Sequence, residues 1–130
     1  MADTEKITIN LGVVDLGKID LLVEQGFFTN RTDFIRTAIR HHLDKHDTQL
    51  QETITRNNFA VGIMIFTASG LKKRLEKGEM LDIYMVGMLV LTDDVSPQLA
   101  RETINSLQVF GNFTASRQVK RALADRIQGR

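Results

Sequence analysis

Three histidines close to residue 45 are the first side chains in the sequence that suggest chemistry. His42 and His46 are four residues apart, so they share one face of a helix and could hold a metal ion between them. No third ligand is evident beside them, and the chain contains no cysteine. Two histidines alone do not make a metal site, so we interpret His41, His42 and His46 as polar residues at the end of a helix. We expect no metal.

Two charged clusters in the second half of the chain are also candidates for chemistry. Asp93 and Asp94 are adjacent carboxylates, but they precede a predicted helix, where acids suit the helix dipole, so we expect no catalytic role. The basic run 72–74 lies on another predicted helix, and we interpret it as a solvated face rather than a second nucleic-acid contact. The sequence has neither a Gly-x-x-x-x-Gly-Lys-Ser/Thr phosphate loop nor a Gly-x-Ser-x-Gly nucleophile elbow. We therefore expect neither an enzyme nor a bound cofactor.

Residues 6–11 alternate polar and apolar side chains without a break, which is the period of a half-buried strand. The polar face carries Lys6, Thr8 and Asn10, and the apolar face carries Ile7, Ile9 and Leu11. No second strand follows within hairpin reach. Because a lone strand leaves its backbone donors and acceptors unpaired, we expect it to pair with the same strand of a second copy across a two-fold axis.

Two helices are predicted to follow this strand. Over residues 15–25, apolar side chains fall on one side of a helix, which Gly26 ends: Leu16, Ile19, Leu22 and Val23. Asn30 is a suitable N-cap for the second helix, whose buried stripe would be Ile35, Ala38, Ile39 and Leu43. At least one of Phe27 and Phe28 should fill the core between the two helices.

The strand, the helix over residues 15–25 and the segment from Gly26 to Arg40 together resemble the ribbon-helix-helix family of bacterial DNA-binding proteins, in particular its CopG-like and ParD-like members. The resemblance implies that two chains pair their strands into a ribbon that lies in the major groove of DNA. Carried over by position, Lys6, Thr8 and Asn10 would contact base edges. Asn30, Arg31 and Thr32 would contact a phosphate, which the free N–H groups and dipole of a helix start attract. The shared dimer core would contain Ile7, Ile9, Leu11, Ile35 and Ile39.

Composition and charge constrain the class of protein but do not indicate what it binds. The chain has 130 residues, of which 42% are hydrophobic, and a formal net charge of +1. Residues 1–46 carry six Lys or Arg against seven Asp or Glu, a net charge of −1, so a DNA-binding surface would need its bases clustered on the ribbon and at the start of the second helix. No run of 18 apolar residues is present, and the absence of cysteine fits a cytoplasmic protein.

The second half of the chain repeats a strand–helix pattern three times. Apolar strands are predicted around Gly62, Gly87 and Gly111, which are 25 and 24 residues apart. The helical pattern after each strand recurs at intervals of 24 residues, in the pairs Leu71 and Leu75, Val95 and Leu99, and Val119 and Leu123. Ser69, Ser96 and Ser116 are candidate N-caps, and Pro97 suits a first helical position. A fixed period of strand and helix favours parallel, solenoid-like pairing, although other α+β arrangements use the same elements.

We therefore expect an α+β protein with a ribbon-helix-helix DNA-binding domain (1–46), a helical linker (47–58) and three strand–helix repeats (59–130). The first hypothesis is a dimeric, sequence-specific transcriptional repressor that binds a double-stranded DNA operator. Its second half would join dimers into tetramers or larger assemblies, or sense a ligand. The second is an antitoxin that binds a toxin partner, although antitoxin tails are usually short and polar. The third is a self-assembling structural protein, which the net negative charge of residues 1–46 favours.

Overall fold

The computed structural model describes residues 4–128, which form two compact units. The first unit comprises residues 6–53, and the second comprises the described residues 4–5 and 54–128. In the described part of the chain, no helix is long and apolar enough to cross a membrane.

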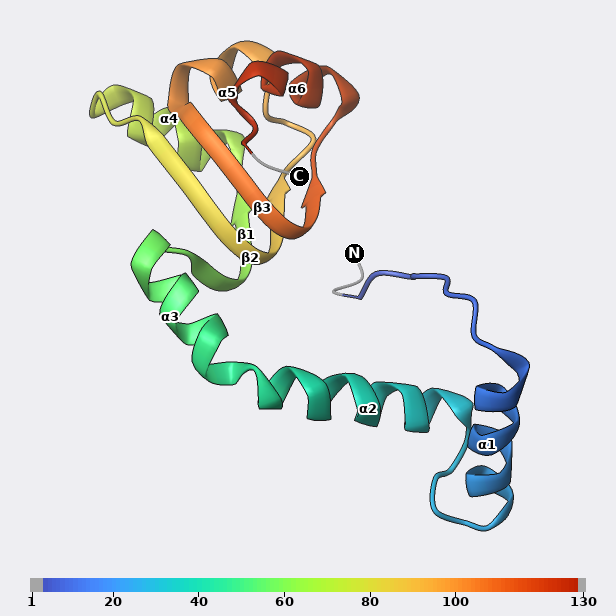
Figure 1. Ribbon diagram of the computed structural model, residues 1–130. Coiled ribbons are helices and arrows are strands. Elements are labelled where there is room, and N and C mark those ends of the chain that lie inside the picture. The colour runs from blue at the N-terminus through green and yellow to red at the C-terminus, as the bar shows by residue number, and fades with distance from the viewer. Residues whose placement is uncertain (1–3, 129–130) are drawn as a thin grey trace. The chain divides into compact units, whose positions relative to one another are not determined.

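The first unit is built on two helices joined by a short loop (Figure 1). Helix α1 spans Val13–Glu24, close to the predicted range, and buries Ile19. Leu16, Leu22 and Val23 are partly buried on the same side, as their spacing predicts. Gly26 has φ +83° just after the helix, a left-handed conformation that glycine adopts without a steric cost, and the chain reverses there.

Helix α2 spans Arg31–Lys45 and begins as predicted. The Asn30 side chain accepts a hydrogen bond of 2.8 Å from the backbone N–H of Asp33, which confirms Asn30 as the N-cap. Asp33 in turn accepts from the N–H of Thr29 at 3.0 Å, so two backbone donors at the helix start are satisfied. Phe28 is half-buried and packs edge-on against Phe34 with ring centroids 4.9 Å apart, whereas Phe27 is exposed.

Residues 4–12 form no helix or hydrogen-bonded strand in the single chain. The predicted strand over residues 6–11 required a second copy, and in the described part of the chain no other segment takes that role. The intermolecular ribbon therefore stays a prediction. Helix α3, Asp47–Asn57, follows α2, and its apolar positions Leu50 and Ile54 are exposed and half-buried respectively.

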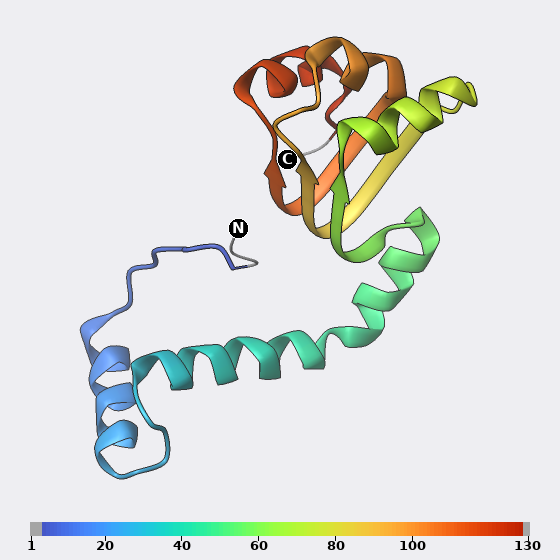
Figure 2. The same ribbon diagram turned by 180° about the vertical axis from the view of Figure 1, so that it is seen from behind.

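The second unit contains three strands, each followed by a helix: β1 (Ala60–Phe66), α4 (Ala68–Glu76), β2 (Leu81–Leu91), α5 (Pro97–Thr103), β3 (Ile104–Thr114) and α6 (Arg117–Ala122). The strands pair in parallel in the order β1-β2-β3, so the predicted parallel pairing is confirmed. Because each connection leads to the next strand in the same direction, the three helices lie on one side of the sheet (Figures 1 and 2). A solenoid-like stack that extends beyond these three strand–helix repeats stays a prediction.

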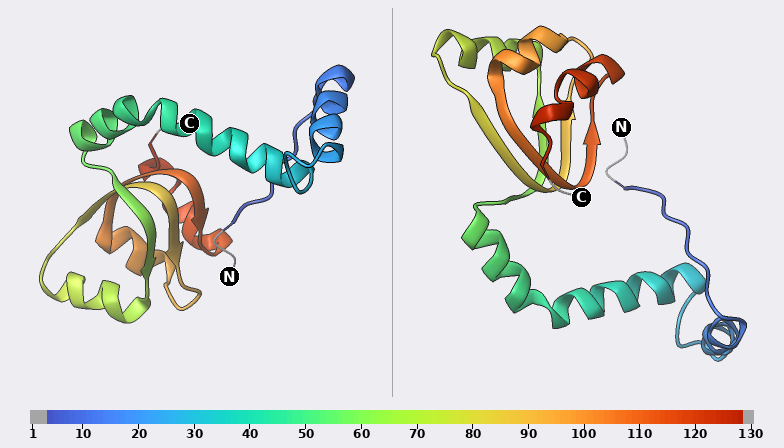
Figure 3. Two further views of the ribbon diagram at one scale, coloured as in Figure 1. Left: turned by 90° about the horizontal axis from the view of Figure 1, so that it is seen from below. Right: turned by 45° about the horizontal axis from the view of Figure 1, so that its top comes forward.

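The strands β2 and β3 are bent part-way along their length, and the helices lie on the concave side of the bend (Figure 3). The three repeated glycines pair across the sheet in one row and have φ values of +133°, +136° and +123° at Gly62, Gly87 and Gly111. A residue with a Cβ rarely adopts such a conformation, so the glycines account for the bend inside otherwise regular strands.

The core of the second unit lies between the sheet and the helices. Its fully buried side chains come from both sides of that interface: Leu71, Met85, Leu89, Ile104, Leu107 and Leu123. Ser96 and Ser116 cap α5 and α6 as predicted, and Pro97 is the first residue of α5. The prediction that Ser69 caps α4 is wrong, because Ser69 is inside the helix and the Thr67 side chain accepts from the N–H of Gly70 instead. Of the apolar pair Leu71 and Leu75 in the first predicted helical pattern, Leu71 is buried and Leu75 is exposed.

Candidate nucleic-acid interface

The segment before α1 exposes both faces of its alternating pattern. The apolar side chains Ile7, Ile9 and Leu11 are 71%, 58% and 41% exposed, and Lys6, Thr8 and Asn10 are exposed as well. Three exposed branched aliphatic side chains within five residues are costly in water, at about 25 cal/mol for each Å² of apolar surface. The segment thus offers an apolar face for association and a polar face with hydrogen-bond donors and acceptors.

The start of α2 brings together the residues predicted to contact phosphate. Asn30, Arg31 and Thr32 are all exposed. The Asn30 side chain caps the helix by accepting from the N–H of Asp33, so the groups at this end that could contact an anion are the backbone N–H groups of Arg31 and Thr32 and the Thr32 hydroxyl. Such a helix start attracts anions through its N–H groups and its dipole.

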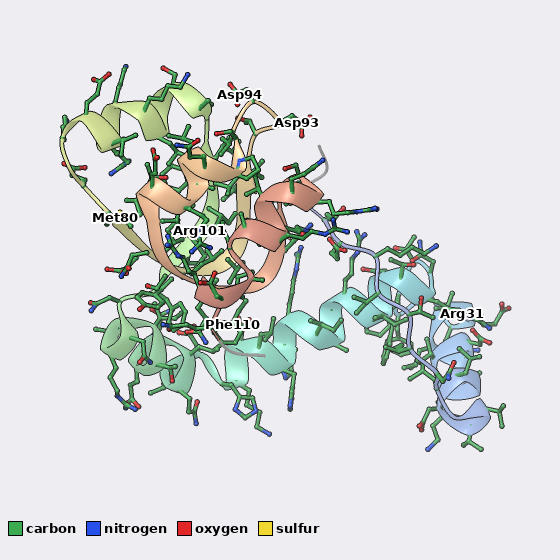
Figure 4. The ribbon with its side chains drawn as sticks, turned by 90° about the horizontal axis from the view of Figure 1, so that it is seen from above. Arg31, Met80, Asp93, Asp94, Arg101 and Phe110 are labelled. Atoms are coloured by element: carbon green, nitrogen blue, oxygen red, sulfur yellow. The ribbon has the colours of Figure 1, made fainter. Side chains whose placement is uncertain are left out.

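Arg31 has a partner within its own chain that sequence reasoning missed. Its Nε and Nη2 donate to the two carboxylate oxygens of Asp20 in α1 at 2.7 and 2.8 Å, and Figure 4 shows Arg31 beside that helix. The hydrogen bonds from Arg31 lower the pKa of Asp20 below its ordinary value. Both side chains remain about half exposed, so a phosphate oxygen could compete with Asp20 for the guanidinium.

The outer face of α2 is apolar and exposed. Ile35 is half-buried, whereas Ile39 and Leu43 are exposed, although both were predicted on the buried stripe. Ile39, Leu43, Ala38 and the two histidines His42 and His46 line a shallow hollow along the helix. The two imidazole rings lie 5.0 Å apart, and in residues 4–128 no group of three or more His, Cys, Asp or Glu side chains is placed to hold a metal.

The charged clusters of the second unit have structural partners. Asp93 and Asp94 lie in the turn between β2 and α5 (Figure 4). The Asp94 carboxylate accepts from the Thr92 hydroxyl and from the N–H of Ala68 at 3.3 Å, and the hydrogen bond from Thr92 is the main reason that its pKa is lowered. Asp94 therefore ties the start of α4 to the end of β2.

The basic run 72–74 is partly neutralised by its surroundings. Arg74 forms an ion pair with Glu79 at 3.5 Å, and its guanidinium lies over the Phe66 ring, 5.7 Å from the centroid. Lys73, Arg74 and Lys77 border an open hollow beside the end of β1, and Glu79 lines the same hollow. Mixed charge of this kind is typical of a solvated helix face.

Comparisons with known proteins found one family and one curated relative. Residues 2–120 match the model of the ribbon-helix-helix transcriptional regulator family. The transcriptional regulator CdrS of Halobacterium salinarum is 33% identical over 42 residues, which cover 32% of this chain and 76% of that protein. No solved structure matches the chain. The family match spans most of the chain and ends inside the helix of the third strand–helix repeat, and we conclude that the chain belongs to the ribbon-helix-helix transcriptional regulator family.

Proposed function

We propose that two copies of this chain pair residues 6–11 into an antiparallel ribbon that lies in the major groove of a DNA operator. The observation that carries the proposal is the exposed alternation of Lys6, Thr8 and Asn10 with three aliphatic side chains directly before two helices. Pairing would supply the missing backbone hydrogen bonds and bury the aliphatic face against α2, whose Ile39 is exposed in the single chain. The dimer core would then be Ile7, Ile9, Leu11, Ile35 and Ile39.

The polar face of the ribbon would read the base sequence. The Lys6 ammonium can donate to O6 or N7 of guanine, and the Asn10 amide can pair with N6 and N7 of adenine. Thr8 can use its hydroxyl with either base or place its methyl group against thymine. All three side chains are exposed and alternate with the apolar ones, so they would project from one face of the strand once the ribbon forms.

The start of α2 would bind the DNA backbone through Asn30, Arg31 and Thr32. Arg31 would exchange Asp20 for a phosphate, or bind the phosphate while it keeps one hydrogen bond to Asp20. This exchange makes the contact weaker than that of a free arginine.

The second unit would join dimers into tetramers or larger assemblies. It has a core of its own, and its strand β1 is apolar and exposed at one edge of the sheet. Linking two dimers makes the second binding event intramolecular and can raise the apparent affinity by about 10²–10⁴ without a new base contact. A protein that covers two adjacent operator sites in this way would repress transcription by excluding other proteins from the promoter.

The antitoxin hypothesis ranks below this proposal. The second unit has a packed core and three capped helices, unlike a segment that stays disordered until a toxin binds it. A self-assembling structural role ranks third, and a ligand-sensing role for the second unit would replace assembly if no larger oligomer forms.

A gel-shift titration on DNA from the protein's own promoter tests the proposal, with oligomer size measured by light scattering. We expect a dimer-based complex on the promoter, tighter than on random DNA, and a full-length oligomer larger than that of a fragment ending at Asn57. Equal affinity for promoter and random DNA would argue for the structural role. If the full-length protein and the fragment contain the same number of subunits, the second unit has no role in assembly.

A further inference from the structure

The row of glycines across the sheet has a directional geometry. A Cβ built on Gly87 would lie 2.0 Å from the carbonyl oxygen of Gly62, and a Cβ built on Gly111 would lie 2.0 Å from the carbonyl oxygen of Gly87. In both pairs the carbonyl of one strand occupies the space that a side chain would need on the next. The carbonyls of Gly62 and Gly87 therefore point from β1 towards β3. Gly111 has the same kind of backbone conformation, with φ +123°, which would direct its carbonyl away from β2.

Gly62, the first member of the row, has no such neighbour among residues 4–128. It has the same kind of backbone conformation, with φ +133°, but no heavy atom lies within 4 Å of a Cβ built on it. The strand that carries it is the free edge of the sheet. Its side chains Val61, Ile63 and Ile65 are 66%, 54% and 62% exposed, and β1 contains no charged residue and no proline. Natural edge strands usually carry charged residues or proline, which prevent pairing with other strands, so we expect another strand to pair with this edge.

In the described part of the chain no strand pairs with the opposite edge of the sheet over residues 109–114 of β3, although the Asn112 side chain there donates to the Glu5 carboxylate at 2.7 Å. At its beginning the edge is occupied, because Leu107 forms a parallel bridge with Ile127 and its carbonyl accepts from the N–H of Gln128 at 2.7 Å. Residues 109–114 lie beyond that contact. The register inside the chain aligns Val109 with Ala60 through β2, and Thr114 with Ile65. The free part of β3 therefore has the length and the glycine position of the free strand β1.

We propose that the β1 edge of one copy pairs in parallel with the β3 edge of a second copy, with the Gly111 carbonyl of the second copy seated against Gly62 of the first. The contact repeats the register that β1, β2 and β3 already use, so it needs no new backbone geometry. It joins unlike surfaces, and therefore either closes into a ring or continues as a stack. The inference rests on the proposed role of the second unit in assembly and is independent of DNA binding.

Disulfide cross-linking of the full-length protein tests the register directly, because the chain has no cysteine of its own. Ile65 is exposed, Thr114 is half-buried, and the proposed pairing places them opposite each other on neighbouring strands. Adjacent strands lie ~4.8 Å apart, within the range of a disulfide. Inside one chain β2 separates the two positions, which are then about 10 Å apart and beyond the limit of ~7 Å.

We expect co-expressed Ile65→Cys and Thr114→Cys chains to give at least several-fold more covalent dimer on a non-reducing gel than either variant alone. The double variant should cross-link between chains without a reductant. Met80→Cys co-expressed with Thr114→Cys is the matched control, since Met80 is exposed but lies in the turn before β2, away from the β1 edge. The control should give only the background yield.

Three outcomes would overturn the inference. If Ile65→Cys alone cross-links as well as the mixture, two β1 edges pair with each other instead. If no cysteine pair cross-links while light scattering still finds a large oligomer, assembly uses another surface and the proposed function stands without this contact. If the wild-type protein forms an oligomer no larger than that of the fragment ending at Asn57, both the inference and the assembly role of the second unit are wrong. A gel shift on the same samples would report DNA binding separately.

Discussion

Gly87→Ala should destabilise the second unit far more than an ordinary glycine-to-alanine change. The new Cβ would lie 2.0 Å from the Gly62 carbonyl oxygen, and real Cβ atoms essentially never come within 3.0 Å of another heavy atom, so β1 and β2 must separate locally by about 1 Å. A separation of that size breaks the two flanking hydrogen bonds, at about 0.5–1.5 kcal/mol each. The backbone strain at φ +136° adds about 1–3 kcal/mol. We expect a loss of about 3 kcal/mol or more in the free energy of unfolding.

Gly78→Ala is the matched control for this experiment. Gly78 also has a positive φ, +69°, but a Cβ there would meet nothing within 4 Å, so only the left-handed strain of about 1–2 kcal/mol applies. Urea unfolding followed by circular dichroism, at one protein concentration for all variants, measures both losses. If Gly87→Ala costs no more than Gly78→Ala, the stacked carbonyls do not dictate glycine in this row, and the argument for the exposed edge at Gly62 fails with it.

Three further predictions concern the first unit and the behaviour of the protein in acid. Ile9→Asp should place a charge in the shared core and abolish the dimer, which analytical ultracentrifugation would show as a loss of mass, and a variant that stays dimeric would refute the ribbon. Asp20→Asn should free Arg31 and strengthen binding to all DNA sequences alike, with a salt dependence of the affinity that is steeper by roughly one counterion. If the salt dependence does not change, Arg31 does not contact the DNA backbone. The third prediction concerns acid: the Asp82 carboxylate accepts from Ser106 at 2.6 Å and from Asn105 at 2.9 Å, and the hydrogen bond from Ser106 is the main reason that its pKa is lowered. The pKa values of Asp20, Asp94 and Asp125 are lowered by their own hydrogen-bond partners. Because a depressed carboxyl pKa stabilises the folded state above the unfolded value of 3.8, this stability should be present at pH 5–7 and lost as the pH falls below about 4. Thermal unfolding across that range tests it, and Asp82→Asn should flatten part of the decline.

Local pattern was sufficient to predict the repeats of the second unit, because their strands are apolar and their helices recur every 24 residues. The predicted strands begin only at Val86 and Phe110, so the pattern misses the first halves of β2 and β3, which carry Asp82, Asn105 and Ser106. These polar side chains interrupt the apolar runs, yet they bond to each other across the two strands. The cap at Thr67 was missed for a similar reason, since both Thr67 and Ser69 suit a helix start and only the position of the turn decides between them.

In the candidate site too, local sequence rules predict some contacts and not others. The Asn30 cap follows from local sequence rules and is present in the structure. The pairing of Arg31 with Asp20 does not, because the two residues are 11 positions apart on different helices and meet only through the packing of α1 on α2. The ribbon lies beyond both, since its strand can form only when a second chain supplies the hydrogen bonds.

Binding of Asn10→Ala to promoter DNA and to random DNA, measured side by side, tests the central claim most directly. If the ribbon reads the operator, the loss of the amide should cost about 1–3 kcal/mol on the promoter and much less on random DNA, because only base contacts carry sequence information. Arg31→Ala should instead weaken both alike. An equal loss on both DNAs for Asn10→Ala, or no loss on either, would contradict base reading by this strand.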